Sequence, residues 1–396
     1  MNLSLQKIQT SLFFTYLTFY MLGTSIYSSH FFVMCKFLLQ ILFIASVCMG
    51  KKHYNGKAAI WIAVMTTVFC LAQLFSLGNS KIVSLLFNVW LFACLSQVST
   101  KKLLLYWGLS FQLLTTFISV DVLWVCLSNN EFRYFRYEVI VDKSFITLFY
   151  SMTFIFCLTH FFMNRRRTLN FLILSFNLFV NVFIVQSKIS ISVFFLCLTI
   201  MIIFGVTNKK RELMYFALGC GIVLTVIHAI LPNQELPNEI SYAINKLYRD
   251  NLYGFDRVQS QQMELTYDIR HALWAYALSL FYAHPILGIG IGNFVEHKFV
   301  YSRDFVITQT ESSFINILTE GGLIYFMIIF FLFCKGINCA YLKFKKFHDP
   351  DYILCFTFFC SYLLLIFGND FMDSIFWIMM GLFMGVLAEK ETAFYK

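Results

Sequence analysis

The chain has 396 residues, of which 59% are hydrophobic and only 13% are charged, and its mean hydropathy is +0.71. A soluble domain carries roughly a quarter charged residues, so this composition excludes an ordinary soluble protein and is typical of a protein whose solvent is a lipid bilayer. The net charge of +9 would suit a nucleic-acid partner, but the positions of the basic residues argue against one.

Twelve apolar stretches are long enough, or nearly so, to cross the roughly 30 Å of hydrocarbon in a bilayer as helices. The sequence therefore predicts an all-α integral membrane protein with about twelve transmembrane helices. In chain order the predicted helices cover residues 11–28, 30–50, 58–77, 82–99, 103–127, 144–163, 168–185, 189–206, 213–231, 313–334, 352–368 and 371–388.

The basic residues gather on one side of these helices. Seventeen lysines and arginines lie in the two tails and in alternate connections, whereas five lie in the opposite short connections. Because the cytoplasmic loops of membrane proteins are enriched in Lys and Arg, both termini are predicted to be cytoplasmic. The net charge therefore indicates topology, and no nucleic-acid partner is expected.

The first predicted helix follows only Lys7 and is longer than the apolar core of a signal peptide. No small-residue cleavage site follows it, so we expect a retained helix. Nearly all of the twelve cysteines lie within predicted helices or at their ends, and no CxxC pair occurs. They are expected to pack as small apolar residues, and the sequence predicts neither a disulfide framework nor a metal site.

Two outer connections in the first half carry charges that suit a ligand. The connection after the fifth predicted helix holds Arg133 and Arg136 among four aromatic residues, which suits sugar rings and phosphate but equally an interfacial aromatic belt. The turn before the eighth predicted helix places Lys188 at a helix N-terminus. A cation beside free backbone N–H groups suits a phosphate, whereas a snorkelling surface lysine would give the same pattern.

Residues 232–312 form a long connection between the ninth and tenth predicted helices, and the charge pattern places this connection in the periplasm or, in a cell with one membrane, outside the cell. The chain thus divides into membrane helices at 1–231, a periplasmic segment at 232–312, and membrane helices with a cytoplasmic tail at 313–396.

Two stretches of the periplasmic segment have apolar residues at helical spacing. One covers residues 240–248, and the other covers residues 265–280. Both are expected to be helices that lie on the membrane surface or cap the bundle. In the second stretch the predicted apolar face consists of Leu265, Ile269, Ala272, Tyr276 and Leu280. The same stretch contains Arg270, whose charge suits either an anionic ligand or an exposed pair with Glu264 or Asp268.

The stretch FYAHPILGIGIGNF, residues 281–294, contains three alternating glycines, Gly288, Gly290 and Gly292. Their GxGxG spacing and the preceding helical pattern do not match the dinucleotide-binding GxGxxG motif, which follows a strand. Glycine permits sharp turns and lets the backbone approach a ligand or another helix closely. Pro285 is expected to end the preceding helix.

Two acidic residues accompany the tenth predicted helix. Thr310 is the predicted N-cap, which would place Glu311 in the first helical turn at the outer membrane surface. There Glu311 would either complement the helix dipole or act as a general base that faces an outer cavity. Glu320 would lie about 13.5 Å deeper in a regular helix, where an ionisable residue needs a partner or a proton. A structural role is favoured for Glu320, with Gly321 and Gly322 beside it at a close helix contact.

These pieces together resemble the O-antigen polymerase and O-antigen ligase superfamily of bacterial envelope glycosyltransferases. The resemblance rests on four motifs in chain order: QSKIS, IRHALWAYAL, HPILGIGIGNF and ESSFINILTEGGLIYF. They lie within residues 186–326, and the rest of the chain agrees in topology. The superfamily implies a GT-C-like membrane fold and a location in the bacterial inner membrane.

The resemblance also implies a reaction. A glycan linked to undecaprenyl diphosphate is transferred to a sugar hydroxyl at the outer face of the membrane, with inversion and without a metal or cofactor. Superfamily members bind the diphosphate through outer arginines, to which Arg270 corresponds. Lys188 stands where an arginine is more common, and a lysine loses the bidentate fork. The implied partners are the lipid-linked oligosaccharide, membrane lipid and, as a candidate, a chain-length regulator protein.

The resemblance assigns further roles. Glu311 is the expected general base and His284 the reserve base. The remaining candidate contacts to glycan or diphosphate are Arg133, Arg136, Trp274 and Asn293. Ligases of the superfamily carry a histidine where this chain reads ESSFI, so Glu311 favours a polymerase of O-antigen, capsular or exopolysaccharide repeat units.

Two alternatives stay open. A ligase of the same fold would transfer the glycan to lipid A core. A flippase or transporter built from two halves would favour a long central cytoplasmic connection, whereas this chain has only NRRRT after its sixth predicted helix.

Overall fold

The computed structural model spans the whole chain and divides it into two compact units. The first consists of Met1–Phe43 and Leu103–Tyr253, and the second of Ile44–Lys102 and Gly254–Lys396. The described residues are 57–77, 80–96, 101–128, 143–162, 167–185, 187–204, 272–297, 299–302, 305–307, 312–368 and 374–388, with short pieces between 8 and 46.

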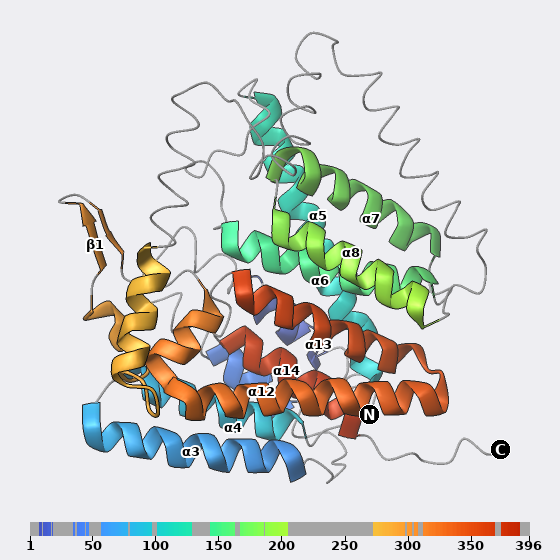
Figure 1. Cartoon of the computed structure of the whole chain (residues 1–396). Coiled ribbons are helices and arrows are strands. Elements are labelled where there is room, and N and C mark those ends of the chain that lie inside the picture. Colours follow the sequence, from blue (N-terminus) through green and yellow to red (C-terminus); the bar gives the residue numbers. More distant parts are fainter. Residues whose placement is uncertain are drawn as a thin grey trace. The chain divides into compact units, whose positions relative to one another are not determined.

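The first unit contains α5 (Lys101–Ser128), α6 (Lys143–Phe162), α7 (Arg167–Val180) and α8 (Lys188–Ile203), with a π-helical turn at Asn181–Val185 after α7. α6 packs against both α7 and α8 (Figure 1). Aromatic side chains fill its core: Phe13 and Phe43 pack on Trp107 with ring centroids 5.4 and 6.3 Å away. Runs of apolar residues without proline favour these helices.

Buried polar side chains join the helices of the first unit. The Ser119 hydroxyl of α5 lies 2.6 Å from the Tyr150 hydroxyl of α6 and donates to Oδ1 of Asn177 in α7, also at 2.6 Å. Gln112 of α5 donates to Asn170 of α7 at 3.0 Å. In apolar surroundings, hydrogen bonds of this kind fix which helix faces meet.

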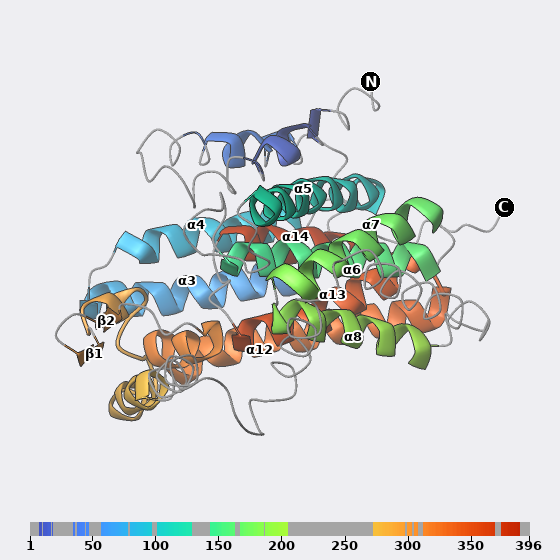
Figure 2. The same ribbon diagram turned by 90° about the horizontal axis from the view of Figure 1, so that it is seen from above.

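The second unit contains α3 (Lys57–Leu77), α4 (Ser80–Leu95), the helix Ala272–Ala283, α12 (Ser313–Phe347), α13 (Pro350–Gly368) and α14 (Ser374–Ala388). α12 packs along α13 and contacts α3 and α14, while α4 packs between α3 and α14 (Figure 2).

A tight turn joins α12 to α13. His348 ends α12 in the left-handed conformation with φ 52°, and its N–H donates to the Phe344 carbonyl. Asp349 then caps α13, because its Oδ1 accepts the N–H of Asp351 at 3.0 Å. Pro350 occupies the first helical position, where proline needs no N–H partner.

The described helices agree with the predicted stretches in number and order over these ranges. The main difference is α12, which continues to Phe347 rather than ending near residue 334. The described residues within 11–28 and 30–50 are helical, and the predicted helix 213–231 lies outside the described residues. The fold is predominantly helical, as predicted.

A short hairpin was not part of the helical prediction. β1 (Phe299–Ser302) and β2 (Phe305–Ile307) pair antiparallel, with Phe299 opposite Ile307 and Val300 opposite Val306. The two runs FVYS and FVI are rich in aromatic and β-branched residues, which favour strands. The hairpin precedes α12 in the chain.

Within the described part of the chain, α12 alone is long and apolar enough to cross a membrane. The other apolar helices there measure 10–17 residues over the parts with described side chains. The total of twelve transmembrane helices therefore stays a prediction.

Candidate functional site

α12 is broken at Gly322, which has φ 63° and ψ −166° in place of helical angles. In a regular helix the N–H of Leu323 would donate to the main-chain carbonyl of Thr319, and the N–H of Ile324 would donate to that of Glu320. Here the two N–H groups donate to the carbonyls of Pro285 and Ile286 instead. In Figure 1 the helix changes direction beside the helix Ala272–Ala283. We call Ser313–Gly321 the outer half of α12 and Leu323–Phe347 the long half.

The segment 285–294, which we call the glycine loop, fills this break with main-chain hydrogen bonds. Its N–H groups at Ile289 and Gly290 donate to the Thr319 and Glu320 carbonyls at 2.9 and 3.0 Å. Its carbonyls at Pro285 and Ile286 accept the N–H groups of Leu323 and Ile324 at 2.8 and 3.3 Å. The loop thus replaces the missing helical bonds on both sides of the break.

The glycines make this approach sterically feasible. Gly288, Gly290 and Gly292 have φ of 69°, 105° and 82°, the left-handed region that favours glycine. A Cβ at Gly288 would lie 2.4 Å from the Glu320 carbonyl oxygen, and one at Gly322 would lie 2.5 Å from the Gly288 nitrogen. The sequence indicated that these glycines allow a close approach either to a ligand or to another helix. The structure shows the approach to a helix, α12.

Glu320 binds the far end of the glycine loop with its side chain. Its carboxylate accepts the N–H of Gly292 at 2.8 Å and the N–H of Phe294 at 3.1 Å. The side chain is buried, and so are both donor residues. This is the structural role that the sequence favoured, although Gly322 beside it breaks the helix instead of permitting close helix packing.

Gln73 of α3 secures the same loop from a distant part of the chain. Its Nε2 donates to the Leu287 carbonyl at 2.7 Å and to the Glu320 carbonyl at 3.2 Å, and its Oε1 accepts the N–H of Ile291 at 3.0 Å. Gln73 is fully buried. Sequence reasoning missed this residue, and the one signal that pointed to it is a lone amide within the apolar run CLAQLF.

The helix Ala272–Ala283 packs against the loop and the outer half of α12. Leu273 and Ala277 form a buried cluster with Ile289 and Phe294 of the loop, and Ile315 of α12 packs against it. The Thr319 hydroxyl donates to the Ala277 carbonyl at 3.2 Å. The helix ends at Ala283, as Pro285 predicted. Tyr276 and Leu280, on the predicted apolar face, are only partly buried. The fully buried residues are Leu273 and Ala277, each one position after a residue of that predicted face.

This packing gives the two helices a common direction. The helix Ala272–Ala283 runs directly into the glycine loop at its C-terminal end. The outer half of α12 likewise meets the loop at its C-terminal end, through Thr319 and Glu320. Because the helices also contact each other at Ala277 and Thr319, they run side by side with their N-terminal ends on the same side.

The predicted reactive residues directly precede these two N-terminal ends. Arg270 stands two positions before Ala272, and Glu311 stands two positions before Ser313. Both lie outside the described residues, as do Arg133 and Arg136. The predicted N-cap at Thr310 is wrong: the structure has Ser312 as the N-cap, so Glu311 precedes the helix rather than occupying its first turn.

Three further candidates lie in or beside the loop. His284 is exposed and follows the C-terminal end of the helix Ala272–Ala283. Trp274 is partly buried against the cluster around Leu273. Asn293 is buried, and its Nδ2 donates to the Ile289 carbonyl at 3.1 Å, so its amide supports the fold of the loop. A glycan contact by Trp274 or Asn293 stays a prediction.

In the first unit, Lys188 is the first residue of α8, as predicted. The residue before it, Ser187, is buried, and its hydroxyl lies 2.9 Å from the hydroxyls of Thr147 and Ser190. The backbone of Lys188 therefore lies at a helix N-terminus that is fixed by the polar cluster of Ser187, Thr147 and Ser190. A π-helical turn ends at Val185, two residues before Ser187. Such turns recur at functional sites.

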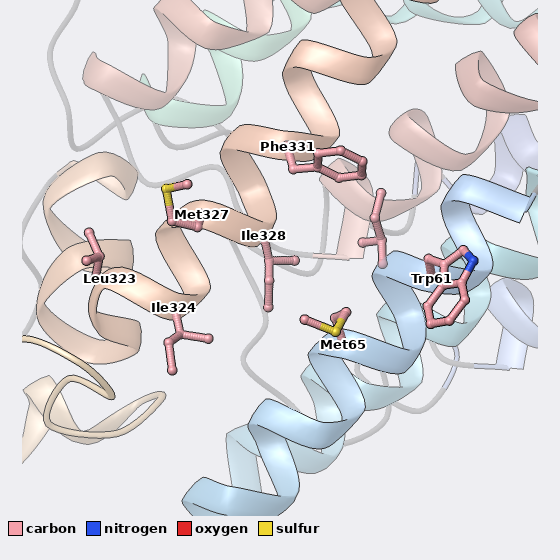
Figure 3. A pocket seen from close by; sticks show the side chains of 8 residues that line it. Trp61, Met65, Leu323, Ile324, Met327, Ile328 and Phe331 are labelled. Atoms are coloured by element: carbon pink, nitrogen blue, oxygen red, sulfur yellow. The ribbon is translucent and has the colours of Figure 1, made fainter.

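An apolar cavity of about 430 Å³ lies between the long half of α12 and α3. The side chains of Trp61 and Met65 from α3 and of Ile324, Met327 and Phe331 from α12 line it (Figure 3). It begins at Leu323 and Ile324, the residues that bond to the glycine loop. Its lining suits an apolar chain rather than a sugar.

Among the described residues no group of three or more His, Cys, Asp or Glu side chains is placed to hold a metal ion. The polar groups at the break in α12 are main-chain groups, the side-chain amide of Gln73 and the carboxylate of Glu320. The amide and the carboxylate each form hydrogen bonds with the main-chain groups.

The apolar helices and the long α12 are consistent with a helical membrane protein. Residues 149–330 match the sequence profile of the family described as O-antigen ligase. This match confirms the resemblance to the O-antigen polymerase and ligase superfamily, and it includes α7, α8, the glycine loop and the break in α12. It supports an enzyme of this broad type, active in polysaccharide biosynthesis. No curated protein matches the chain.

Proposed function

We propose that the protein is a polysaccharide polymerase of the bacterial inner membrane. It transfers the growing glycan from undecaprenyl diphosphate to a sugar hydroxyl of the next lipid-linked repeat unit, on the periplasmic face and with inversion. The observation that carries the proposal is the packing of the helix Ala272–Ala283 along the outer half of α12. This packing supports a common site for Arg270 and Glu311, because each residue precedes one of the two adjacent helix ends.

In the proposed reaction the acceptor hydroxyl attacks the anomeric carbon of the donor sugar. The bond from that carbon to the diphosphate oxygen breaks, and the leaving diphosphate takes the electron pair. Arg270 and Lys188 neutralise the diphosphate, which is the main electrostatic task of the site. Glu311 takes the proton of the hydroxyl, and a base of this kind contributes roughly 10²–10⁴-fold in rate.

The geometry favours Glu311 over His284 as the base. The helix Ala272–Ala283, twelve residues and about 18 Å long, lies in the chain between Arg270 and His284. His284 adjoins the opposite end of the helix Ala272–Ala283, next to the break in α12. A base there would not reach a hydroxyl beside a diphosphate that Arg270 holds.

The other predicted contacts complete the proposal. Arg133, Arg136 and Trp274 contribute to glycan or diphosphate binding through aromatic faces and cationic charge. The apolar cavity between α3 and α12 agrees with a donor that carries a lipid chain. A chain-length regulator protein is the proposed further partner.

The alternative is a ligase, which the description of the matched family favours. Glu311 argues against a ligase, because ligases of the superfamily carry a histidine at this place. Deletion of the gene and complementation, with the surface polysaccharide separated by size, distinguishes the two. A ladder that collapses to single repeat units on deletion supports the polymerase, whereas polymer that stays on its lipid carrier and is missing from lipid A core supports the ligase. An unchanged polysaccharide contradicts both.

A further inference from the structure

We propose that Glu320 is a positioning residue of the transfer reaction. Its carboxylate holds the glycine loop in the break of α12, and the loop in turn fixes the outer half of α12 against the helix Ala272–Ala283. The inference rests on the proposed function, since it concerns the relative positions of Arg270 and Glu311. It extends that function to a residue that does not touch the substrate.

The glycine loop has buried N–H groups that need hydrogen-bond acceptors. The N–H groups of Gly292 and Phe294 belong to buried residues and cannot be left unpaired without a large penalty. Both donate to the one carboxylate, at 2.8 and 3.1 Å. Two acceptor oxygens on one group suit this task, because a glutamine at the same place would present one acceptor oxygen and an NH₂ group that only donates.

Glu320 ties the loop along most of its length. Its main-chain carbonyl accepts the N–H of Gly290 and the Nε2 of Gln73. Its side chain binds the loop two and four residues further on. Phe294, at the end of the loop, is also part of the buried cluster with Leu273 and Ala277. A displaced loop would therefore shift the helix Ala272–Ala283 relative to α12.

The expected consequence concerns the chemical step. Diphosphate binding depends on the charges of Arg270 and Lys188, whereas proton removal depends on the position of Glu311 relative to the bound donor. A misplacement of about 1 Å costs on the order of 100-fold in rate. Loss of the Glu320 carboxylate is thus expected to lower kcat while KM for the lipid-linked donor stays nearly unchanged.

The experiment uses the full-length protein in lipid nanodiscs, with lipid-linked repeat units as substrate. Glu320→Gln is compared with the wild type and with Glu296→Gln, a matched change at an exposed glutamate near the loop. We expect kcat per folded molecule to fall on the order of 100-fold in Glu320→Gln, with little change in KM, and to stay at the wild-type value in Glu296→Gln. A residue that serves stability alone would reduce the yield of folded protein but leave kcat per folded molecule unchanged.

A second variant keeps the test decisive if Glu320→Gln does not fold. Gln73→Met removes the amide that also ties the loop while it preserves the length of the side chain. We expect it to lower kcat in the same way but by less, because the carboxylate still binds the loop. Wild-type kcat in every variant that folds would overturn the inference. A wild-type protein that forms no polymer from lipid-linked repeats would instead overturn the proposed function, and the inference with it.

Discussion

The two units of the molecule bury polar groups in apolar surroundings in different ways. In the first unit α5, α6 and α7 are continuous, and side chains such as Ser119, Tyr150 and Asn177 bond between them. In the second unit α12 itself is broken, and main-chain groups of a distant loop replace its hydrogen bonds. Side-chain bonds can be removed singly at modest cost, whereas a junction made of main-chain groups depends on the conformation of the whole loop.

The largest effect is expected from a side chain added within the junction. Gly288→Ala places a Cβ against the Glu320 carbonyl and forces alanine into φ 69°, a strain of about 1–3 kcal/mol before the overlap is counted. We expect loss of most of the folded protein, measured as the monodisperse fraction after solubilisation. Gly108→Ala in α5 is the comparison, because the atoms nearest its Cβ belong to a side chain, the buried ring of Phe156, and not to the backbone of another segment. Equal losses in both variants would remove the distinction between the units.

The next effect separates chemistry from scaffold within the second unit. Arg270→Ala and Glu311→Gln lie outside the junction, so both proteins are expected to fold and insert normally. Polymer formation should nevertheless fall roughly 10²–10⁴-fold in Glu311→Gln, because an amide cannot take the proton. Arg270→Ala should abolish polymer, because the leaving diphosphate loses its counter-charge. Wild-type chain lengths in either strain would remove that residue from the proposed site.

Lys188 tests what the first unit contributes to function. Lys188→Arg keeps the positive charge at the start of α8 and should retain activity, whereas Lys188→Ala should lose most of it. The polysaccharide ladder of complemented strains provides the measurement. If the two variants and the wild type are equally active, Lys188 is a snorkelling residue and does not belong to the proposed diphosphate site.

The smallest effect is expected in the side-chain network. Ser119→Ala removes the hydroxyl that bonds to Tyr150 and Asn177. Such bonds between membrane helices contribute about 0.6 kcal/mol on average. We expect a small decrease in thermal stability in detergent and unchanged polymer. A loss as large as that of Gly288→Ala would show that this network, too, fails as a whole.

The sequence predicted those features that a local pattern specifies. Long apolar runs specified the helices, Pro285 specified the end of the helix Ala272–Ala283, and an acidic residue at membrane depth specified a structural role for Glu320. The N-cap of α12 was misplaced because the run TQTESS offers several residues that can cap a helix. Capping preference alone does not choose between Thr310 and Ser312.

The junction itself could not be predicted, because its parts lie far apart in the chain. Adjacent glycines in an apolar helix fit close packing as well as a break, and only the loop that supplies replacement hydrogen bonds decides for the break. Gln73 bonds to residues more than 200 positions away. No local pattern around it specifies that partner, since an isolated amide in an apolar helix suits many contacts.

The proposed site requires positions 270 and 311 to be neighbours, which cross-linking can measure. Cysteines introduced in pairs, Arg270→Cys with Glu311→Cys and Arg270→Cys with His284→Cys, are treated in membranes with a short bifunctional maleimide, and linked peptides are identified by mass spectrometry. We expect a link between 270 and 311 and none between 270 and 284, because a helix about 18 Å long lies between these two positions in the chain. A link from 270 to 284 without one to 311 would contradict the proposed site.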